Sequence, residues 1–200
     1  MYGITSTTPQ FKSAIEILRL IRAYAPGKRV IIGGPHPTVM PESCGLFDSI
    51  VQGYGEEAIL EAIQPDSPKL LDQASNVQKG TLNYLIPARH LIDMDSYKYS
   101  LEGVKGTNIL TEMGCPFGCL FCSGRLSPFY RRVKYRDTGE IIQELIEIRD
   151  RYGFNSFMDF SDEINLLNEP LIDFCQKLKP LGMKFRAFVK ANLFSDVQAE

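Results

Sequence analysis

Three cysteines within eight residues carry the clearest chemistry of this sequence. They are Cys115, Cys119 and Cys122, in the run CPFGCLFC. Their C-x3-C-x2-C spacing allows three thiolates on one short loop each to bind one iron of a cubane, which leaves the fourth iron open to a small molecule. A closed structural zinc site, the alternative, requires four ligands. The other candidate ligands have no paired spacing, which favours the cluster over zinc; they are Cys44, Cys175, His36 and His90.

The composition is that of an ordinary globular protein, with 44% hydrophobic and 23% charged residues. The formal net charge of -2 is spread over segments of mixed sign, so the sequence has no basic stripe of the kind that binds nucleic acid. No apolar run is long enough to span a membrane, and no signal peptide follows Met1. An odd number of cysteines with three clustered is typical of a metal site in a reducing compartment. We therefore expect a cytoplasmic protein that has no membrane span and does not bind nucleic acid.

The elements around the cysteine loop predict an α/β fold. In residues 1–63, short apolar strands alternate with amphipathic helices, as in a doubly wound parallel sheet whose ligands bind beyond the carboxyl ends of the strands. Three strands are expected at 2–7, 29–34 and 49–55, with helices at about 11–21 and 56–63.

Residues 64–106 lose this periodicity and contain a proline-punctuated stretch, so we interpret them as a connection between domains. Residues 107–200 resume the strand and helix alternation. Strands are expected at 108–114, 154–160 and 184–194, and helices begin after Asp137, whose D-x-x-E box ends in Glu140, and near Glu169. Cys175 lies between two leucines at helical spacing and is expected in the core.

We expect both ends of the chain to be cut. The sequence opens within a strand, and Ser195 with Gln198 forms a box that announces a further helix at its end. We expect a fragment of a longer protein.

The cysteine run resembles the signature loop of the radical S-adenosylmethionine family, with the aromatic Phe121 before its last cysteine. The longer run GCPFGCLFCS is similar to the cobalamin-dependent branch of that family. The resemblance implies a partial (β/α)6 barrel, here its first βα units, whose first strand precedes the loop. It also implies that the open iron of a [4Fe–4S] cluster chelates S-adenosylmethionine, which is cleaved to methionine and a 5′-deoxyadenosyl radical by an electron from a low-potential donor such as flavodoxin or ferredoxin.

Further residues match positions that the family uses to hold S-adenosylmethionine. Asp162 and Glu163 follow the second strand, where acidic groups receive the ammonium group, although a solvated acidic loop has the same composition. Lys190 stands where the family usually has arginine. A lysine attracts a carboxylate but lacks the two-pronged geometry of arginine.

Residues Gly3–Glu56 resemble the carboxyl-terminal half of a flavodoxin-like (Rossmann-type) cobalamin-binding domain. The resemblance places the hydroxyl and glycine positions Ser6, Thr7, Thr8, Gly33 and Gly34 around the nucleotide tail of cobalamin. The plain alternative is that the two glycines end a strand. The family's D-x-H-x-x-G motif is absent; His36 follows the wrong strand to replace its cobalt ligand and is interpreted as a loop residue. Tyr54 replaces the family's usual glutamate.

The sequence therefore predicts a fragment of a cobalamin-dependent radical S-adenosylmethionine enzyme acting on a small-molecule substrate, by methyl transfer or related radical chemistry. Its expected regions are a partial cobalamin-binding domain at 1–63, a linker at 64–106 and the start of a radical S-adenosylmethionine core at 107–200. The alternative is a non-catalytic module that binds an iron–sulfur cluster or zinc.

Overall fold

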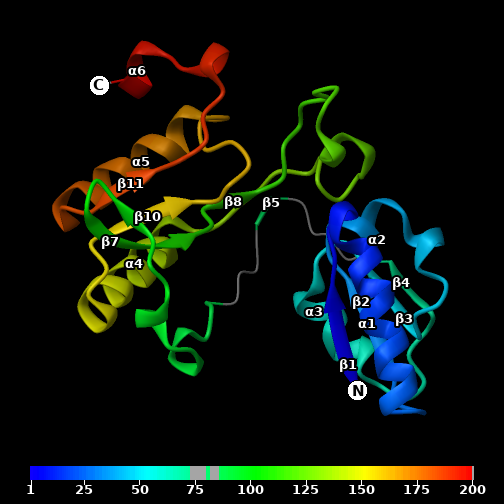
Figure 1. Ribbon diagram of the computed structural model, residues 1–200. Coiled ribbons are helices and arrows are strands. Elements are labelled where there is room, and N and C mark those ends of the chain that lie inside the picture. The colour runs from blue at the N-terminus through cyan, green and yellow to red at the C-terminus, as the bar shows by residue number, and fades with distance from the viewer. Residues whose placement is uncertain (73–79, 82–85, 200) are drawn as a thin grey trace. The chain divides into compact units, whose positions relative to one another are not determined.

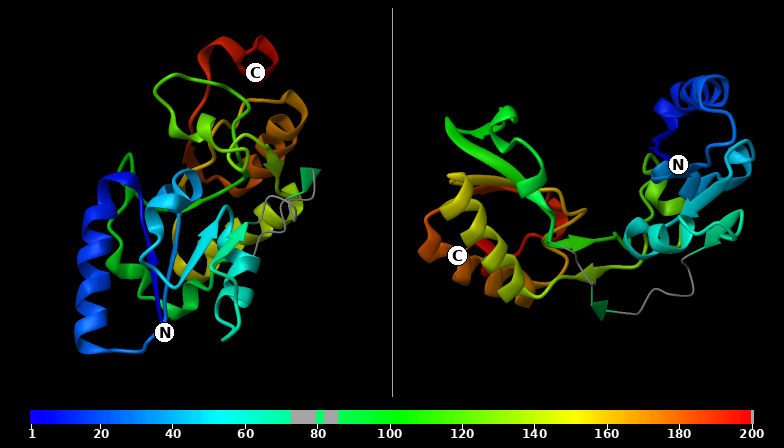
Figure 2. Two further views of the ribbon diagram at one scale, coloured as in Figure 1. Left: turned by 90° about the vertical axis from the view of Figure 1, so that its right-hand side faces the viewer. Right: turned by 90° about the horizontal axis from the view of Figure 1, so that it is seen from below.

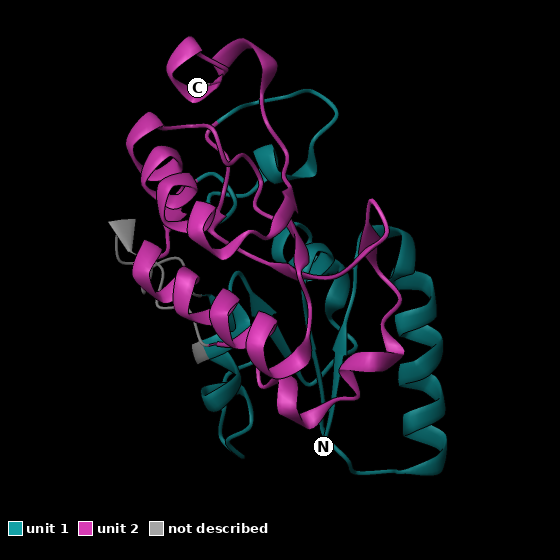
Figure 3. Ribbon diagram, turned by 90° about the vertical axis from the view of Figure 1, so that its left-hand side faces the viewer, with its two compact units in different colours: residues 1–78, 117–131 teal, residues 79–116, 132–200 magenta. Residues whose placement is uncertain are grey.

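The computed structural model describes residues 1–72, 80–81 and 86–199, and the chain forms two compact units. Unit 1 comprises Met1–Gln78 and Phe117–Arg131, and unit 2 comprises Lys79–Pro116 and Arg132–Glu200 (Figure 3). The chain thus passes from unit 1 to unit 2 and returns to unit 1 for one short segment, which contains two of the three cysteines.

Unit 1 is built on a parallel sheet of four strands in the order β1-β2-β3-β4. The strands are β1 (Tyr2–Thr5), β2 (Val30–Gly33), β3 (Ser49–Gln52) and β4 (Leu70–Asp72). The predicted parallel α/β architecture is confirmed. The first three strands lie where the sequence predicts them.

Helices cover both faces of this sheet (Figure 1). On one face, α1 (Phe11–Tyr24) packs its Ala14 and Leu18 against Val30 and Ile32 of β2. On the other face, α3 (Gly55–Ala62) contributes alanines to a second apolar cluster with Ile31, the intervening residue of β2. Because successive strand residues point to opposite faces, the short all-apolar run of β2 fills both cores.

Shorter elements connect the strands of unit 1. They are the 3-10 helices η1 (Thr8–Gln10) and η2 (Pro41–Cys44) and the one-turn helix α2 (Pro35–Val39). Strand β4 lies within residues 64–106, which the sequence predicts as a linker without periodicity. Only one of its three residues, Leu71, is buried, so no local pattern announces it, and its register is set by pairing with β3.

Unit 2 contains a mixed sheet in the order β11-β10-β7-β6. Strands β7 (Val104–Ile109), β10 (Ser156–Asp159) and β11 (Lys184–Arg186) are parallel, and β6 (Ser100–Leu101) pairs with β7 as a short antiparallel edge. The strand predicted over 184–194 ends at Arg186. A second sheet, in the order β5-β9-β8, is formed by Gly80–Thr81, Lys134–Tyr135 and Glu112–Met113.

Two helices pack side by side against one core in unit 2 (Figures 1 and 2). Helix α4 (Thr138–Tyr152) begins after Asp137, whose carboxylate accepts from the Glu140 amide at 3.1 Å, and ends at Gly153 with a φ of 69°. Helix α5 (Asn168–Leu178) has Pro170 in its first turn, as predicted. The two caps of α4, Asp137 and Gly153, and Pro170 at the start of α5 are local signals, which is why the sequence predicts these helices well.

The core of unit 2 joins α4 and α5 to β7 and β10. Phe157 of β10 is fully buried and stacks on Phe185 of β11 with ring centroids 5.5 Å apart. Cys175, predicted to lie in this core, is exposed instead, because Leu171, Phe174 and Leu178 are the α5 residues that point inward. No helix in the described part of the chain is long and apolar enough to cross a membrane.

The remaining elements of unit 2 and the returning segment are short. They are η3 (Arg89–Leu91), η4 (Met94–Ser96), η5 (Ser123–Leu126), η6 (Lys179–Leu181), η7 (Ala191–Leu193) and α6 (Asp196–Ala199). The first two, like β6, lie in the expected linker and pack beside β7.

A buried carboxylate holds the end of β7 to α4. Glu144 of α4, 1% exposed, contacts Arg89 at 2.6 Å and Arg136 at 2.7 Å. The same guanidinium groups donate to the backbone of β7 and the residue that follows it: Arg89 to the Asn108 carbonyl at 3.1 Å and Arg136 to the Leu110 carbonyl at 2.7 Å. One negative charge therefore compensates two buried cations and fixes the end of β7, the strand that precedes β8 and the cysteine loop.

We expect Glu144→Gln to lower the free energy of unfolding by about 3–5 kcal/mol, because it leaves two buried guanidinium groups without a counter-charge. Glu147→Gln on the same helix is the matched control, since its pair with Arg151 lies on the surface and contributes less than about 1 kcal/mol. Urea denaturation at pH 7 measures both. Equal losses for the two variants would show that the buried pair has no special role.

Candidate functional site

The chain passes from unit 2 to unit 1 within the loop that carries the three cysteines. Cys115 is half-buried and belongs to unit 2, whereas Cys119 and Cys122, half-buried and exposed respectively, belong to unit 1. The Cys122 amide donates to the Cys119 carbonyl at 3.0 Å, which closes a tight turn between them. Phe121, between these two, is 93% exposed.

The donor set of this loop fits an iron–sulfur cluster. None of the three thiols is used in a disulfide. A Cβ at Gly124 would lie 3.4 Å from the Cys122 sulfur, so the glycine leaves space beside that thiol. Within residues 1–72, 80–81 and 86–199, no three His, Cys, Asp or Glu side chains are gathered as around a metal ion. The grouping of the three thiolates therefore stays a prediction from their spacing.

The residue before the first cysteine is fixed by a hydrogen bond to a predicted site residue. Gly114 is buried, has a φ of 94°, and would place a Cβ 2.2 Å from the Arg132 carbonyl oxygen. Only glycine fits there. Its amide donates to the Asp162 carboxylate at 2.8 Å, so this carboxylate, predicted to receive an ammonium group, already anchors the cysteine loop.

A buried polar network lies at the carboxyl ends of β7 and β10. The Asp159 carboxylate, 0% exposed, accepts from the Thr111 hydroxyl at 2.6 Å and from the amide and hydroxyl of Ser161 at 3.0 and 2.5 Å. The Ser161 hydroxyl in turn accepts from the amides of Thr111 and Glu112. These bonds satisfy the buried carboxyl group of Asp159 and hold two strand ends together.

The predicted residue Glu163 lies close to Lys190 in the same unit. Burial raises the pKa of Glu163, while a hydrogen bond from the Lys190 backbone and the Lys190 charge oppose that rise. The structure therefore brings these two predicted residues together. Asn165 supports the arrangement, because its side-chain oxygen accepts from the Lys190 amide at 2.9 Å.

Glu112 is a site residue that the sequence reasoning missed. It is 1% exposed; one carboxyl oxygen accepts from the Glu163 amide at 2.8 Å, and the other has no hydrogen-bond partner among the described residues. Burial raises its pKa to about 8, with a smaller contribution from nearby carboxylates including Asp159 and Asp162. The sequence places Glu112 inside the expected strand 108–114, where a single carboxyl is a weak signal, and its burial is visible only in the fold.

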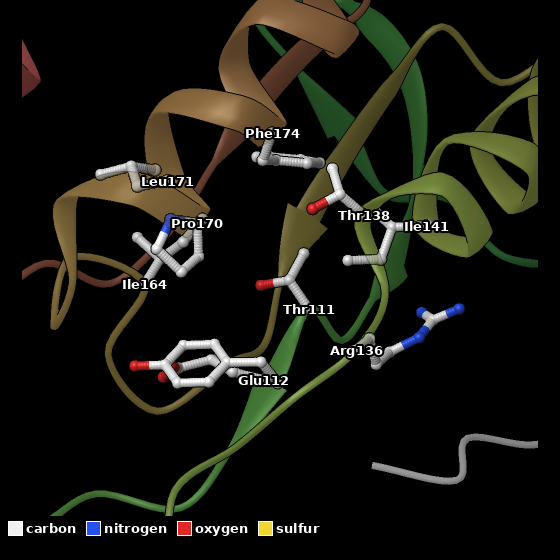
Figure 4. A pocket seen from close by; sticks show the side chains of 10 residues that line it. Thr111, Glu112, Arg136, Thr138, Ile141, Ile164, Pro170, Leu171 and Phe174 are labelled. Atoms are coloured by element: carbon white, nitrogen blue, oxygen red, sulfur yellow. The ribbon is translucent and has the colours of Figure 1, made fainter. Parts of the chain in front are cut away.

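A small cavity adjoins Glu112 between the first turns of α4 and α5 (Figure 4). Its volume of about 20 Å³ is enough for one water molecule. Thr111, Thr138 and Glu112 supply polar groups at its wall, and Ile164 and Phe174 supply apolar ones. A carboxyl that faces so small and mostly apolar a space is stabilised in its neutral form.

In unit 1, the predicted hydroxyl and glycine residues gather where β1 and β2 end. Ser6 is buried and its hydroxyl donates to the Thr7 carbonyl, whereas Thr7 and Thr8 are exposed. A Cβ at Gly34, where φ is 99°, would lie 2.6 Å from the Thr5 hydroxyl oxygen. The second glycine is thus required by close packing against β1. Gly33 has a negative φ and ends β2.

His36 is not the loop residue that the sequence predicts. It lies in α2, is 4% exposed, and stacks on Phe11 with ring centroids 4.0 Å apart. Its two ring nitrogens lie 3.1 Å from the Thr8 hydroxyl and 2.8 Å from the Ser43 hydroxyl. Burial lowers its pKa. The neutral ring therefore joins the Thr8 turn to η2.

We expect the unfolding free energy of Glu112→Gln, relative to wild type, to rise with pH. The carboxyl has a pKa of about 8 when folded and about 4.5 when unfolded, so between these values only the unfolded state ionises and wild-type stability falls as pH rises. The variant lacks this loss, which amounts to at most about 5 kcal/mol. Denaturation between pH 5 and 8.5 measures it.

Glu147→Gln, at the surface of the same unit, is the control and should leave the pH dependence unchanged. A Glu112→Gln variant whose stability follows the wild-type pH dependence would show that Glu112 is ionised in the folded protein.

Comparison with known proteins found a family model that matches the first third of the chain and relatives that match nearly all of it. Residues 1–63 match the family model described as the B12 binding domain. An uncharacterized methyltransferase of Pyrococcus horikoshii is 27% identical over 221 aligned residues, which cover 99% of this chain and 48% of the relative. The bacteriochlorophyllide d C-12(1)-methyltransferase of Chlorobaculum tepidum is 30% identical, covering 95% of this chain and 42% of the relative. The chain thus spans less than half the length of these relatives.

A solved structure shares the fold over the whole chain. It is the radical S-adenosylmethionine methyltransferase TsrM from Kitasatospora setae, whose structure holds cobalamin and a [4Fe–4S] cluster. The TM-score is 0.69 at 17% identity, and the match covers 100% of this chain and 47% of that one. Residues 1–63 thus match the B12 binding domain, and the chain as a whole is similar in sequence to these methyltransferases and in fold to a radical S-adenosylmethionine methyltransferase, which confirms the resemblance predicted from its sequence.

Proposed function

We propose that this chain is part of a radical S-adenosylmethionine enzyme whose [4Fe–4S] cluster is bound by Cys115, Cys119 and Cys122. The observation that carries the proposal is the anchoring of Gly114 to Asp162, because it fixes the start of a three-cysteine loop just beyond the carboxyl ends of β7 and β10. In α/β folds, ligands bind at that edge of the sheet. The relatives named methyltransferases support the same assignment.

The residues near this edge suit S-adenosylmethionine. When bound, the cluster supplies the electron, received from a low-potential donor such as flavodoxin or ferredoxin, that cleaves this cofactor reductively. Glu163 offers a carboxylate to the cofactor's ammonium group, and Lys190 offers a cation to its carboxylate. Asp162 contributes indirectly, since its carboxylate already holds the Gly114 amide. Phe121, largely exposed on the loop, supplies an apolar contact.

Unit 1 is proposed to bind cobalamin at the carboxyl edge of its parallel sheet. Thr7 and Thr8 are exposed there, near Gly33 and Gly34; the Thr7 hydroxyl donates to Gln10 at 2.9 Å, and the Thr8 hydroxyl lies 3.1 Å from the His36 ring. Ser6 stabilises the turn, because its buried hydroxyl donates to the Thr7 carbonyl. With both cofactors, methyl transfer to a small-molecule substrate or a related radical reaction is the proposed outcome. Residues 107–200 are then the first βα units of a partial (β/α)6 barrel in a cytoplasmic enzyme.

Anaerobic reconstitution should load the protein with about four irons and four sulfides, as a cubane requires. Alanine at Cys115, Cys119 or Cys122 should each abolish this content, because each thiolate holds one iron. Cys175→Ala, which removes an exposed thiol elsewhere, should retain it. Iron and sulfide analysis with the visible absorption spectrum measures the outcome. Stoichiometric zinc in place of iron would instead favour a non-catalytic metal-binding module.

Reduction of the loaded protein with dithionite in the presence of S-adenosylmethionine should yield 5′-deoxyadenosine and methionine. Glu163→Ala should slow this cleavage roughly tenfold at limiting cofactor, the loss expected for one charge-assisted hydrogen bond. The backbone amide of Glu163, which contacts Glu112, is retained in that variant. Glu169→Ala, at the exposed first turn of α5, is the control. Unchanged cleavage by a Glu163→Ala protein with a full cluster would remove Glu163 from the site.

A further inference from the structure

The segment that follows the third cysteine packs back onto unit 1 through one aromatic ring. Phe129 is 3% exposed, although its neighbours in the segment, Leu126 and Pro128, are exposed. A Cβ built on Gly53 would lie 2.5 and 2.6 Å from two atoms of the Phe129 ring. The ring therefore occupies the space that any other residue at position 53 would fill.

Gly53 is held firmly at the carboxyl end of β3. Its φ is 92°, a conformation that favours glycine. Its amide donates to the Thr38 hydroxyl oxygen at 3.1 Å, and that hydroxyl donates to the Gly34 carbonyl at 2.7 Å. Tyr54, the next residue, donates its phenolic hydroxyl to the Phe129 carbonyl at 3.4 Å. The Gly-Tyr-Gly turn thus contacts both the ring and the backbone of Phe129.

We propose that Phe129 is a positioning residue that holds the segment 117–131, with Cys119 and Cys122, on the B12-binding unit at the carboxyl end of β3. The ring fills the place above Gly53, and Tyr54 fixes the adjoining backbone. Two of the three cysteines are thereby tied to the sheet edge where unit 1 is proposed to bind cobalamin. The relevance to cofactors rests on the proposed function, whereas the packing itself does not.

This packing assigns a role to residues that the predicted function leaves without one. Gly53 and Tyr54 lie in the turn where Tyr54 replaces the usual glutamate of the family that the sequence resembles. A tyrosine reaches the Phe129 carbonyl through its hydroxyl, which is a donor, whereas an ionised glutamate has no donor to offer. A tyrosine at position 54 therefore suits the packing of the segment 117–131, because it supplies the donor that the Phe129 carbonyl accepts.

Limited trypsin digestion of the iron-free protein tests the proposal without any cofactor. Phe129→Ala should speed cleavage after the exposed Arg125 and Arg131 by at least about tenfold, because the segment opens more often. Cleavage after Arg19 in α1 and Lys177 in α5 should not change. Phe129→Leu should restore most of the protection, and Leu126→Ala, which removes an exposed side chain of the same segment, should match wild type.

Alkylation of thiols, followed by mass spectrometry, reports on the cysteines themselves. In Phe129→Ala, the half-buried Cys119 should react faster, while Cys115 in unit 2 and the fully buried Cys44 in the core of unit 1 should react as in wild type. Faster reaction of Cys44 as well would mean that Phe129 merely stabilises unit 1, which overturns the positioning role. Unchanged reactivity of Cys119 would overturn it too.

A pair of glycine variants probes the other side of the contact. Gly53→Ala should reproduce the effects of Phe129→Ala, because the added Cβ displaces the ring. Gly27→Ala is the matched control: its φ of 79° imposes similar backbone strain, but no atom lies within 4 Å of its Cβ position. Equal protection of the segment in both variants would contradict the proposal. These outcomes are independent of whether the protein binds iron, so they do not depend on the proposed function.

Discussion

The hydrogen bond between the Gly114 amide and the Asp162 carboxylate determines where the cysteine loop leaves unit 2. It acts together with the steric limit at Gly114, where the Arg132 carbonyl excludes any side chain. Because Cys115 is the next residue, its backbone starts from a fixed point at the end of the sheet. The hydrogen-bond network centred on Asp159 stabilises this position, because it joins the residues after β7 to those at and after the end of β10.

This end of the sheet gathers several acidic groups in a buried region, which costs stability. The cost of burying Asp159 is offset by several hydrogen-bond donors. Glu112 instead remains neutral, because burial raises its pKa to about 8. A neutral carboxyl at Glu112 avoids repulsion from the nearby carboxylates of Asp159 and Asp162. Strained or destabilised groups of this kind are typical of functional sites, where stability is given up for a specific arrangement.

Local signals allowed much of the fold to be predicted from the sequence. The apolar runs of β2 and β10 and the caps of α4, Asp137 and Gly153, are encoded within a few residues, and each element forms where expected. By contrast, β4 depends on its pairing with β3, and Cys175 is exposed because neighbouring α5 residues fill the core. Glu112 and Phe129 escape prediction for the same reason: their partners lie far away in the chain, and only the fold brings them together.

The glycines of unit 1 show how a binding pattern and a packing pattern overlap. Gly34 is required by its close approach to Thr5 and Ser6, and Gly53 by the Phe129 ring, so internal contacts already explain both residues. A glycine-rich turn is therefore weak evidence for a nucleotide by itself. The stronger argument is that Thr38 links the two turns through hydrogen bonds to Gly34 and Gly53. That link joins the Gly34 and Gly53 turns at the carboxyl edge of the sheet, where the returning cysteine segment packs through Phe129.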